Sequence, residues 1–270
     1  MSLLEEAKQL IHLHKFSPKR GLGQNFAVDM TILRRMISFA SVDKEDVVLE
    51  IGAGLGFLTR LLCEECKQVI AIEIDSRLVE ILRSQLRGLE NVDLIEGDAL
   101  RIDIPLFDKV VSTPPYSISS SMLFWLLGKP FSCAVLTFQR EFAKRLTAHV
   151  GDKDYGRLTI SAYYRADVEL LTDVSRKTFY PSPDVESTIV RLKPRAPPFH
   201  VENEFLFFSL LRTLFMQPNK KVRNAIIPFL RNLGVERDDA MNRVNSLLLY
   251  NRRVRQLTPE DFGDLANEFA

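Results

Sequence analysis

The chain reads Val47-Val48-Leu49-Glu50-Ile51-Gly52-Ala53-Gly54-Leu55-Gly56 at the point where a short apolar run meets a glycine-rich turn. The apolar run predicts a strand, and the residues that follow, as far as about Cys66, predict a helix. Glycine lets the backbone approach a ligand closely, and the first turn of a helix presents free N–H groups. The stretch therefore predicts a strand, a turn that can face a ligand, and a helix.

Strands and helices are expected to alternate on either side of this turn. Apolar runs predict further strands at residues 69–73, 92–95, 109–111 and 133–138. Helical spacing predicts helices at residues 3–14, 29–40, 76–87, 119–127 and 140–149, with Ser76 as the N-cap of its helix. Alternation of this kind is typical of a doubly wound sheet, so the predicted fold is α/β and Rossmann-like.

The second half of the chain changes character. Residues 158–164 and 187–192 are rich in strand-forming residues, and we expect them to form an antiparallel pair at the edge of the sheet. The proline-rich segment 194–198 is typical of a linker, and from about residue 203 onward the pattern is helical. We therefore expect a Rossmann-like domain at residues 1–194 and a small all-α domain at residues 195–270.

The composition limits the classes of protein to which this chain can belong. A chain of 270 residues, 46% of them hydrophobic, can bury a sizeable core, and its net charge of +1 does not by itself indicate a nucleic-acid binder. Three cysteines, no apolar run of about 18 residues and no signal-peptide pattern indicate a reduced, cytoplasmic protein. Cys63 and Cys66 have a metal-site spacing, but without a second cysteine pair or a nearby histidine we expect no metal.

Acidic residues follow two neighbouring predicted strands. Glu73 ends the strand after the glycine turn, where a carboxylate can accept hydrogen bonds from both ribose hydroxyls of an adenosine. Asp98 follows the next strand, where it can accept from an adenine amine. Each also has a plain structural explanation, Glu73 as a solvated strand end and Asp98 as a helix N-cap. Together with the turn they indicate a ligand site, because α/β sheets bind ligands at the carboxyl ends of their strands.

The sequence Thr113-Pro114-Pro115-Tyr116, called the shelf below, follows the predicted strand at 109–111. The prolines fix the backbone and lack N–H groups, so nearby carbonyls are free to face a ligand. The tyrosine offers a flat apolar face with a polar tip. The shelf therefore suits an unstacked nucleobase held by its exocyclic amine, and the alternative explanation is a proline-rich turn that caps a strand.

The glycine turn by itself fits NAD, FAD or S-adenosylmethionine, or a turn without a ligand. A dehydrogenase usually needs an acid–base residue near the substrate carbonyl. None of the histidines lies at a predicted strand end; they are His12, His14, His149 and His200. Methyl transfer from a sulfonium needs mainly the alignment of donor and nucleophile. The shelf supplies that alignment, so S-adenosylmethionine is favoured as the cofactor.

The chain resembles the KsgA-type ribosomal RNA adenine dimethyltransferases, including their archaeal members, in motifs along its whole length. The similar stretches are Leu22-Gly23-Gln24-Asn25-Phe26 and residues 48–56, 72–75, 96–99, 139–146, 154–158, 179–187 and 220–224. The resemblance implies an S-adenosylmethionine-dependent enzyme that methylates N6 of two adjacent adenosines near the 3′ end of small-subunit rRNA. It also implies an immature ribosomal subunit as partner, a role in its maturation, and a monomer.

The resemblance also assigns residues to the site. It implies cofactor binding by Gln24, Asn25, Ala27, Gly52, Gly54, Glu73, Asp98 and Thr113. The residues that would align the target base are Thr113, Pro114 and Tyr116. No dedicated base is required, because the proton can leave to water. We expect Tyr116 to stack on the flipped base, with Phe179 or Tyr180 as a second face.

The chain departs from the family at the shelf, where the family usually has Asn-Leu-Pro-Tyr. The Asn carbonyl is expected to accept a hydrogen bond from the adenine amine, whereas the Thr113 hydroxyl accepts one but reaches less far. Losing one aligned hydrogen bond would slow transfer roughly ten- to a hundred-fold. Similar Ser-Pro-Pro-Tyr shelves occur in enzymes that methylate the exocyclic amine of cytosine. Two alternatives therefore stay open: methylation of cytosine N4, and a ribosome-assembly factor that binds RNA with weak or no catalysis.

Basic residues gather in short runs. The runs are Lys15 with Lys19 and Arg20, Arg140 with Lys144 and Arg145 on one helix face, Lys220 with Lys221 and Arg223, and Arg252 with Arg253 and Arg255. A single run of this kind is usually solvated surface. Several runs on a near-neutral chain indicate a face for phosphate contacts. The residues expected to contact RNA are Arg140, Lys144, Lys220, Lys221 and Arg223.

Overall fold

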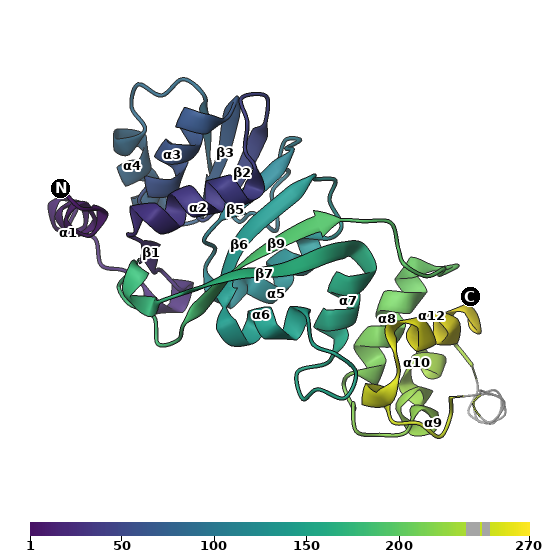
Figure 1. Cartoon of the computed structure of the whole chain (residues 1–270). Coiled ribbons are helices and arrows are strands. Elements are labelled where there is room, and N and C mark those ends of the chain that lie inside the picture. Colours follow the sequence, from purple (N-terminus) through teal and green to yellow (C-terminus); the bar gives the residue numbers. More distant parts are fainter. Residues whose placement is uncertain (236–243, 245–248) are drawn as a thin grey trace. The chain divides into compact units, whose positions relative to one another are not determined.

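The computed structural model describes residues 1–235, 244 and 249–270 (Figure 1). Contacts between residues divide the chain into two compact units. The first is Met1–Ala143 with Val168–Pro194, and the second is Lys144–Asp167 with Arg195–Ala270. Each unit has a hydrophobic core of its own. None of the helices in these described ranges is long and apolar enough to cross a membrane.

Within the described residues, the first unit is built on a seven-stranded sheet with the strand order β4-β3-β2-β5-β6-β9-β7. Its strands are β2 (Val47–Ile51), β3 (Gln68–Glu73), β4 (Val92–Glu96), β5 (Lys109–Ser112), β6 (Cys133–Gln139), β7 (Ala166–Val174) and β9 (Ser187–Pro194). Strands β2 to β6 pair in parallel, and β9 is antiparallel to β6. The predicted α/β, Rossmann-like sheet is confirmed.

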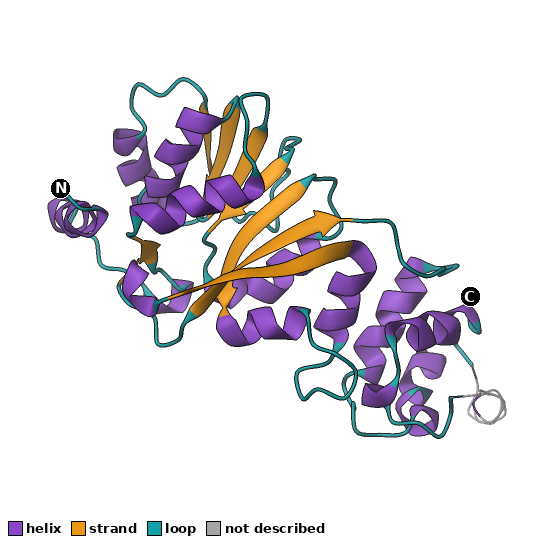
Figure 2. Cartoon of the chain, in the orientation of Figure 1, coloured by secondary structure: helices purple, strands orange, loops and turns teal. Residues whose placement is uncertain are grey.

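Helices flank this sheet on both faces (Figure 2). They are α2 (Met30–Ala40), α3 (Phe57–Glu65), α4 (Ser76–Gln85), α5 (Ser119–Leu126) and α6 (Arg140–Leu146), the last of which continues into the second unit. Helix α1 (Leu3–Leu13) precedes them in the chain and is joined to α3 by the ion pair between Glu6 and Arg60. A separate small sheet pairs β1 (Phe26–Ala27) antiparallel with β8 (Phe179–Tyr180). This pairing holds the N-terminal segment against the segment that precedes β9.

The central strands read as continuous apolar runs because both of their faces are covered. In β2 and β3 every side chain after the first residue is buried, as expected for parallel strands with helices on both sides. Two of these buried side chains are acidic, Glu50 and Glu73, and each lies at or next to the carboxyl end of its strand. A buried carboxyl group is unfavourable unless it has partners, so these two residues point to a site.

The strand order predicts where a ligand binds. From β2 the chain adds β3 and β4 on one side, and then it returns to add β5 and β6 on the other side. Such a reversal leaves a crevice at the carboxyl ends of the strands, which is where α/β sheets bind ligands. Gly52 follows β2 and Thr113 follows β5. The glycine turn and the shelf therefore meet at this crevice.

The second unit is helical in the part that the structure describes. Its helices are α7 (Arg157–Arg165), α8 (Glu204–Leu214), α9 (Val222–Ala225), α10 (Ile227–Asn232) and α12 (Pro259–Asn267). The helical pattern predicted from about residue 203 is confirmed for α8, α9, α10 and α12. Residues 236–243 and 245–248, which the same prediction covers, lie outside the described residues.

The prediction of a strand at residues 158–164 is wrong, because this segment forms α7. Ile160 and Tyr164 lie in the core of the second unit, and the Tyr164 ring is 5.0 Å from the ring of Phe207, centroid to centroid. Burial of strand-forming residues in this core outweighs their local preference. The partner of β9 is instead β6, with β7 on its other side.

Two helix ends also differ from prediction. The helix predicted at 140–149 ends at Leu146. The N-cap of α4 is Asp75 rather than Ser76, because the Asp75 carboxylate accepts a hydrogen bond from the backbone N–H of Arg77 at 3.2 Å. An aspartate is as good an N-cap as a serine, so the local sequence does not show which of Asp75 and Ser76 caps the helix.

The boundary placed after residue 194 stays a prediction about independently folding domains. Contacts group residues 144–167 with the C-terminal helices, since the side chains of α7 belong to the second core. A long-range hydrogen bond from the Tyr155 hydroxyl to the Leu257 carbonyl, 2.8 Å in length, joins the same two segments.

We predict that Gly52→Ala lowers the free energy of unfolding by about 2 kcal/mol. Gly52 has a φ of +80°, and a Cβ there would lie 3.1 Å from Cδ of Pro115. A side chain is disfavoured at this φ, and the contact adds strain. Urea unfolding measures the change. Gly21→Ala is the matched control, since a Cβ there meets nothing within 4 Å, and equal stability of the two variants would contradict the prediction.

Candidate functional site

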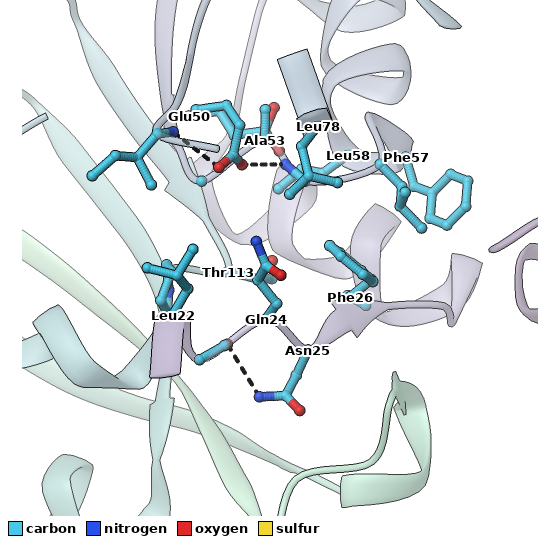
Figure 3. A pocket seen from close by; sticks show the side chains of 18 of the residues that line it. Leu22, Gln24, Asn25, Phe26, Glu50, Ala53, Phe57, Leu58, Leu78 and Thr113 are labelled. Atoms are coloured by element: carbon cyan, nitrogen blue, oxygen red, sulfur yellow. Dashed lines mark hydrogen bonds between the residues drawn. The ribbon is translucent and has the colours of Figure 1, made fainter. Parts of the chain in front are cut away.

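A pocket with about 590 Å³ of empty space, partly open to solvent, lies at the carboxyl ends of β2, β3 and β5 (Figure 3). This volume falls in the range of small-molecule sites. Its polar lining includes Gln24, Asn25, Glu50, Glu73 and Thr113. Its apolar wall includes Leu22, Phe26, Phe57, Leu58, Ile74 and Leu78, and the glycine turn forms its edge. We call this the larger pocket.

Glu73 is fixed by three backbone groups. One carboxylate oxygen accepts from the N–H of Gly54 at 3.0 Å, and the other accepts from Ile74 at 2.9 Å and Asp75 at 3.0 Å. Burial raises the pKa of Glu73, although these hydrogen bonds act in the opposite direction. A carboxylate has about four acceptor positions. Because three are engaged, Glu73 retains room for about one ligand hydroxyl, where the sequence led us to expect two.

Glu50 is a second acid in the larger pocket. Its side chain is 2% exposed, and it accepts a hydrogen bond of 2.6 Å from the Thr59 hydroxyl. Burial, opposed by this hydrogen bond and supported by the charge of Glu73, raises the pKa of Glu50 to about 8. At neutral pH the Glu50 carboxyl is therefore mostly protonated.

The N-terminal segment is held to the pocket by Asp75. The Gln24 amide donates to Asp75 at 2.9 Å, and its carbonyl accepts from the N–H of Lys19 at 2.7 Å. The Arg77 guanidinium also binds Asp75, with one N–O distance of 2.8 Å, and it holds the pKa of that carboxyl well below its usual range. This guanidinium lies 4.6 Å from the centre of the Phe16 ring. Asp75 thus joins the start of α4 to the segment that contains Gln24 and Asn25.

A smaller hollow of about 200 Å³ adjoins the larger pocket. Its lining residues are Gly23, Asn25, Thr113, Pro114, Tyr116, Thr137 and Phe179. The first three of these also line the larger pocket. The two cavities therefore meet at Asn25 and Thr113, and the predicted shelf residues Pro114 and Tyr116 face the smaller one.

The ring of Tyr116 is oriented by a hydrogen bond. Its hydroxyl lies 2.5 Å from the hydroxyl of Ser187 at the start of β9. Burial raises the pKa of Tyr116, so the phenol stays neutral. Phe179, predicted as a second face, is buried and lines the same hollow.

Most of the predicted cofactor residues gather at the larger pocket, and one does not. The lining includes Gln24, Asn25, Ala27, Gly52, Gly54, Glu73 and Thr113. Asp98 is not part of it, because its carboxylate accepts from the N–H of Leu100 at 3.0 Å and pairs with Arg101 at 3.2 Å. The role of Asp98 in adenine binding stays a prediction.

Two of the basic runs lie side by side in the second unit. Lys221 and Arg253 form an antiparallel β-bridge, and the N–H of Val254 donates to the Lys220 carbonyl at 3.0 Å. Lys220, Arg253 and Arg255 are exposed. Residues 220–223 and 252–255 therefore make one basic surface, which the sequence showed only as separate runs. Arg140 and Lys144 lie on α6.

Several site residues were missed by the sequence-based prediction. Glu50 is an acidic residue within the apolar strand of the Val47–Gly56 stretch, and this unusual position could have indicated a site residue. Ile74 is 53% exposed beside a buried acid, and a large apolar residue at a strand end is a second such signal. No local pattern identified Thr137 or Ser187, because their positions at the site depend on strand pairing.

The sheet has a Rossmann-like arrangement with a pocket at its strand ends, and solved structures similar to this chain are methyltransferases. Residues 15–270 match the family model described as ribosomal RNA adenine dimethylase. The chain therefore belongs to the ribosomal RNA adenine dimethylase family, and its sequence-based recognition as a KsgA-type member is confirmed.

Similar proteins agree with this assignment. The chain is 42% identical over 258 residues to the probable ribosomal RNA small subunit methyltransferase A of Methanosarcina acetivorans, covering 94% of this chain and 95% of that protein. A dimethyladenosine transferase from Plasmodium falciparum has a similar structure, with a TM-score of 0.74, 32% identity and coverage of 88% of this chain and 94% of that one. The 23S rRNA methyltransferase ErmE gives a TM-score of 0.66 at 28% identity, covering 90% and 99%.

We predict that the protein loses stability as the pH rises from about 4.5 to about 8. In the folded state the pKa of Glu50 is raised from 4.5 to about 8, so in this window the folded state keeps a proton that the unfolded state has lost. Stability therefore falls with pH there and levels off above it.

Glu50→Gln tests this prediction, because it keeps the shape and the acceptor for Thr59 but does not titrate. Urea unfolding between about pH 5 and pH 8 should give a flatter dependence for the variant than for the wild type. Parallel curves would mean that Glu50 ionises normally.

Proposed function

We propose that this protein is an S-adenosylmethionine-dependent rRNA methyltransferase that transfers methyl groups to N6 of two adjacent adenosines near the 3′ end of small-subunit rRNA. The observation that carries the proposal is that the larger pocket and the smaller hollow share Gly23, Asn25 and Thr113. A cofactor in the first and a base in the second would meet at these residues. Membership of the ribosomal RNA adenine dimethylase family supports the same activity.

The larger pocket fits S-adenosylmethionine in size and in chemistry. Its apolar wall suits an adenine ring and Glu73 suits a ribose hydroxyl. A cationic ligand beside Glu50 would favour the ionised form of this carboxyl group. When bound, this cofactor supplies an electrophilic methyl group. The residues that we propose to hold it are Gln24, Asn25, Ala27, Gly52, Gly54, Glu73 and Thr113, with Asp98 as a further candidate.

The smaller hollow suits a flat base taken out of its stack. Tyr116 and Phe179 offer ring faces, and the hydrogen bond between Tyr116 and Ser187 fixes one of them. Aromatic side chains that stack on an extruded base are the usual way to hold it. We propose that these two rings bind the target adenine.

The residues of the shelf align the amine rather than remove its proton. The Thr113 hydroxyl and the Pro114 carbonyl are acceptors that can hold the amine hydrogens and so orient the nitrogen lone pair. The lining of the smaller hollow includes no charged side chain. We therefore propose that the amine proton leaves to water after transfer.

We further propose that the substrate is the rRNA of an immature small subunit, bound in the cytoplasm by a monomer. The basic surface formed by residues 220–223 and 252–255, together with Arg140 and Lys144 on α6, would contact phosphates. Lys221 and Arg223 belong to this surface.

The test is methyl transfer from labelled S-adenosylmethionine to immature small subunits, followed by mass analysis of the nucleosides. We expect dimethyladenosine from the wild type. The Thr113→Asn variant, which restores the residue usual in the family, should react at least as fast.

Other products would favour the alternatives that the Thr113 hydroxyl leaves open. Methylated cytidine would replace adenine N6 by cytosine N4 as the target. Absence of product from the wild type, with activity gained by Thr113→Asn, would favour an assembly factor that binds RNA without catalysis.

We predict that Asp75→Ser raises the dissociation constant of the cofactor roughly tenfold, because Gln24 and Arg77 lose their common partner. Serine remains a good N-cap for α4, so the helix should persist. Calorimetric titration with S-adenosylhomocysteine measures the affinity. Arg83→Ala, which removes an exposed ion pair with Glu96 at 3.9 Å, is the control and should bind as the wild type does. Equal affinities of all three proteins would contradict the role of Asp75.

A further inference from the structure

Thr137 lines the smaller hollow together with Thr113, although no motif in the sequence indicates it. The parallel pairing of β5 with β6 sets Ser112 opposite Leu136. The next residues along, Thr113 and Thr137, therefore occupy matching positions where the two strands end at the hollow.

The two threonine side chains are expected on the same face of the sheet. Alternate residues of a strand share a face, and Val111 and Val135, two positions earlier, both belong to the core that contains α2. The Thr137 hydroxyl does lie on that side, because it donates to Sδ of Met36 in α2 at 3.5 Å. Two hydroxyl groups from neighbouring strands thus border one cavity.

Both hydroxyls have free acceptor capacity. Thr137 is 1% exposed, and its contact with a thioether, a weak acceptor, leaves its oxygen lone pairs without a donor among the described residues. The Thr113 hydroxyl has no hydrogen bond to any other residue in the described ranges. Buried hydroxyls are normally hydrogen-bonded, so an open acceptor at the wall of a ligand hollow points to a ligand donor.

We propose that Thr137 is a specificity-determining residue whose hydroxyl accepts a hydrogen bond from the exocyclic amine of the target base, beside Thr113. The inference rests on the proposed function. An unmethylated amine offers two N–H donors, one for the Pro114 carbonyl and one for the two threonine hydroxyls. In this chain two short hydroxyls on adjacent strands do what a single longer amide would do on the shelf.

The number of amine hydrogens gives the proposal a distinctive consequence. In each transfer the nitrogen lone pair forms the N–C bond, the C–S bond breaks with its electron pair left on sulfur, and the nitrogen releases one proton to water. After the first transfer only one N–H remains for the acceptors. Loss of the Thr137 hydroxyl should therefore slow the first transfer more than the second.

Single-turnover methylation of immature small subunits, with mono- and dimethyladenosine counted over time, tests this inference. We expect Thr137→Val to slow the first transfer roughly tenfold, with a smaller effect on the second transfer. Thr137→Ser, which keeps the hydroxyl, should react almost as the wild type does. Thr113→Asn combined with Thr137→Val should recover most of the rate, because the amide reaches the amine on its own.

Two controls separate this role from a structural one. Affinity for S-adenosylhomocysteine, measured by calorimetry, should not change in Thr137→Val. Ser161→Ala removes a buried hydroxyl that has no hydrogen-bond partner among the described residues, in α7 of the second unit, and should leave both transfers unchanged. If Thr137→Val does not fold, Thr137→Ala compared with Thr137→Ser makes the same test.

The outcomes distinguish the inference from the proposed function. No methylated nucleoside from the wild type would overturn both. An active wild type with Thr137→Val equally fast would overturn the role of Thr137 alone. Equal slowing of both transfers, or weaker cofactor binding, would also overturn it, because Thr137 would then act on the fold or on the cofactor.

Discussion

The buried carboxylate of Glu73 is the interaction on which the rest of the site depends. Through three backbone N–H groups it fixes the glycine turn at Gly54 and the connection from β3 into α4 at Ile74 and Asp75. Asp75, placed by this connection, then holds Gln24 of the N-terminal segment. Hydrogen bonds to a carboxylate are strong where water is excluded, and an unpaired buried N–H is costly. The arrangement of the wall of the larger pocket therefore depends on this one side chain.

A pocket with two buried carboxyl groups is arranged for ligand binding at some expense of stability. Burial raises the pKa of both Glu50 and Glu73, and the charge of Glu73 on the adjacent strand raises that of Glu50 further. Hydrophobic residues of similar size would pack there more favourably. A cationic ligand beside the pair would favour the ionised form of Glu50, and the proposed cofactor carries such a charge.

The shelf illustrates how a substitution within a family can be compensated at a distance. Thr113 is a shorter acceptor than the amide usual at that position, and the structure sets a second hydroxyl, Thr137, on the neighbouring strand. The two residues are 24 positions apart in the chain, a separation that follows from their numbers. Hydroxyl groups also accept and donate in either direction, so the pair is less selective for one tautomer or one base than an amide is. If Thr137 acts as we propose, base choice and the number of methyl groups depend on both strands together.

The sequence by itself determined the strand–turn–helix unit at Val47–Gly56, the acid Glu73 and the shelf, because glycine, proline and strand-end acids act through local backbone geometry. It also carried the family, through motifs spread over the whole chain. Tertiary structure decided between conformations that local sequence patterns do not distinguish. Residues 158–164 form α7 because their apolar side chains fill the second core. It alone set Thr137 beside Thr113, Ser187 against Tyr116, and residues 220–223 beside 252–255. Strand register and packing couple residues that are far apart in the chain, and no spacing along the sequence encodes that coupling.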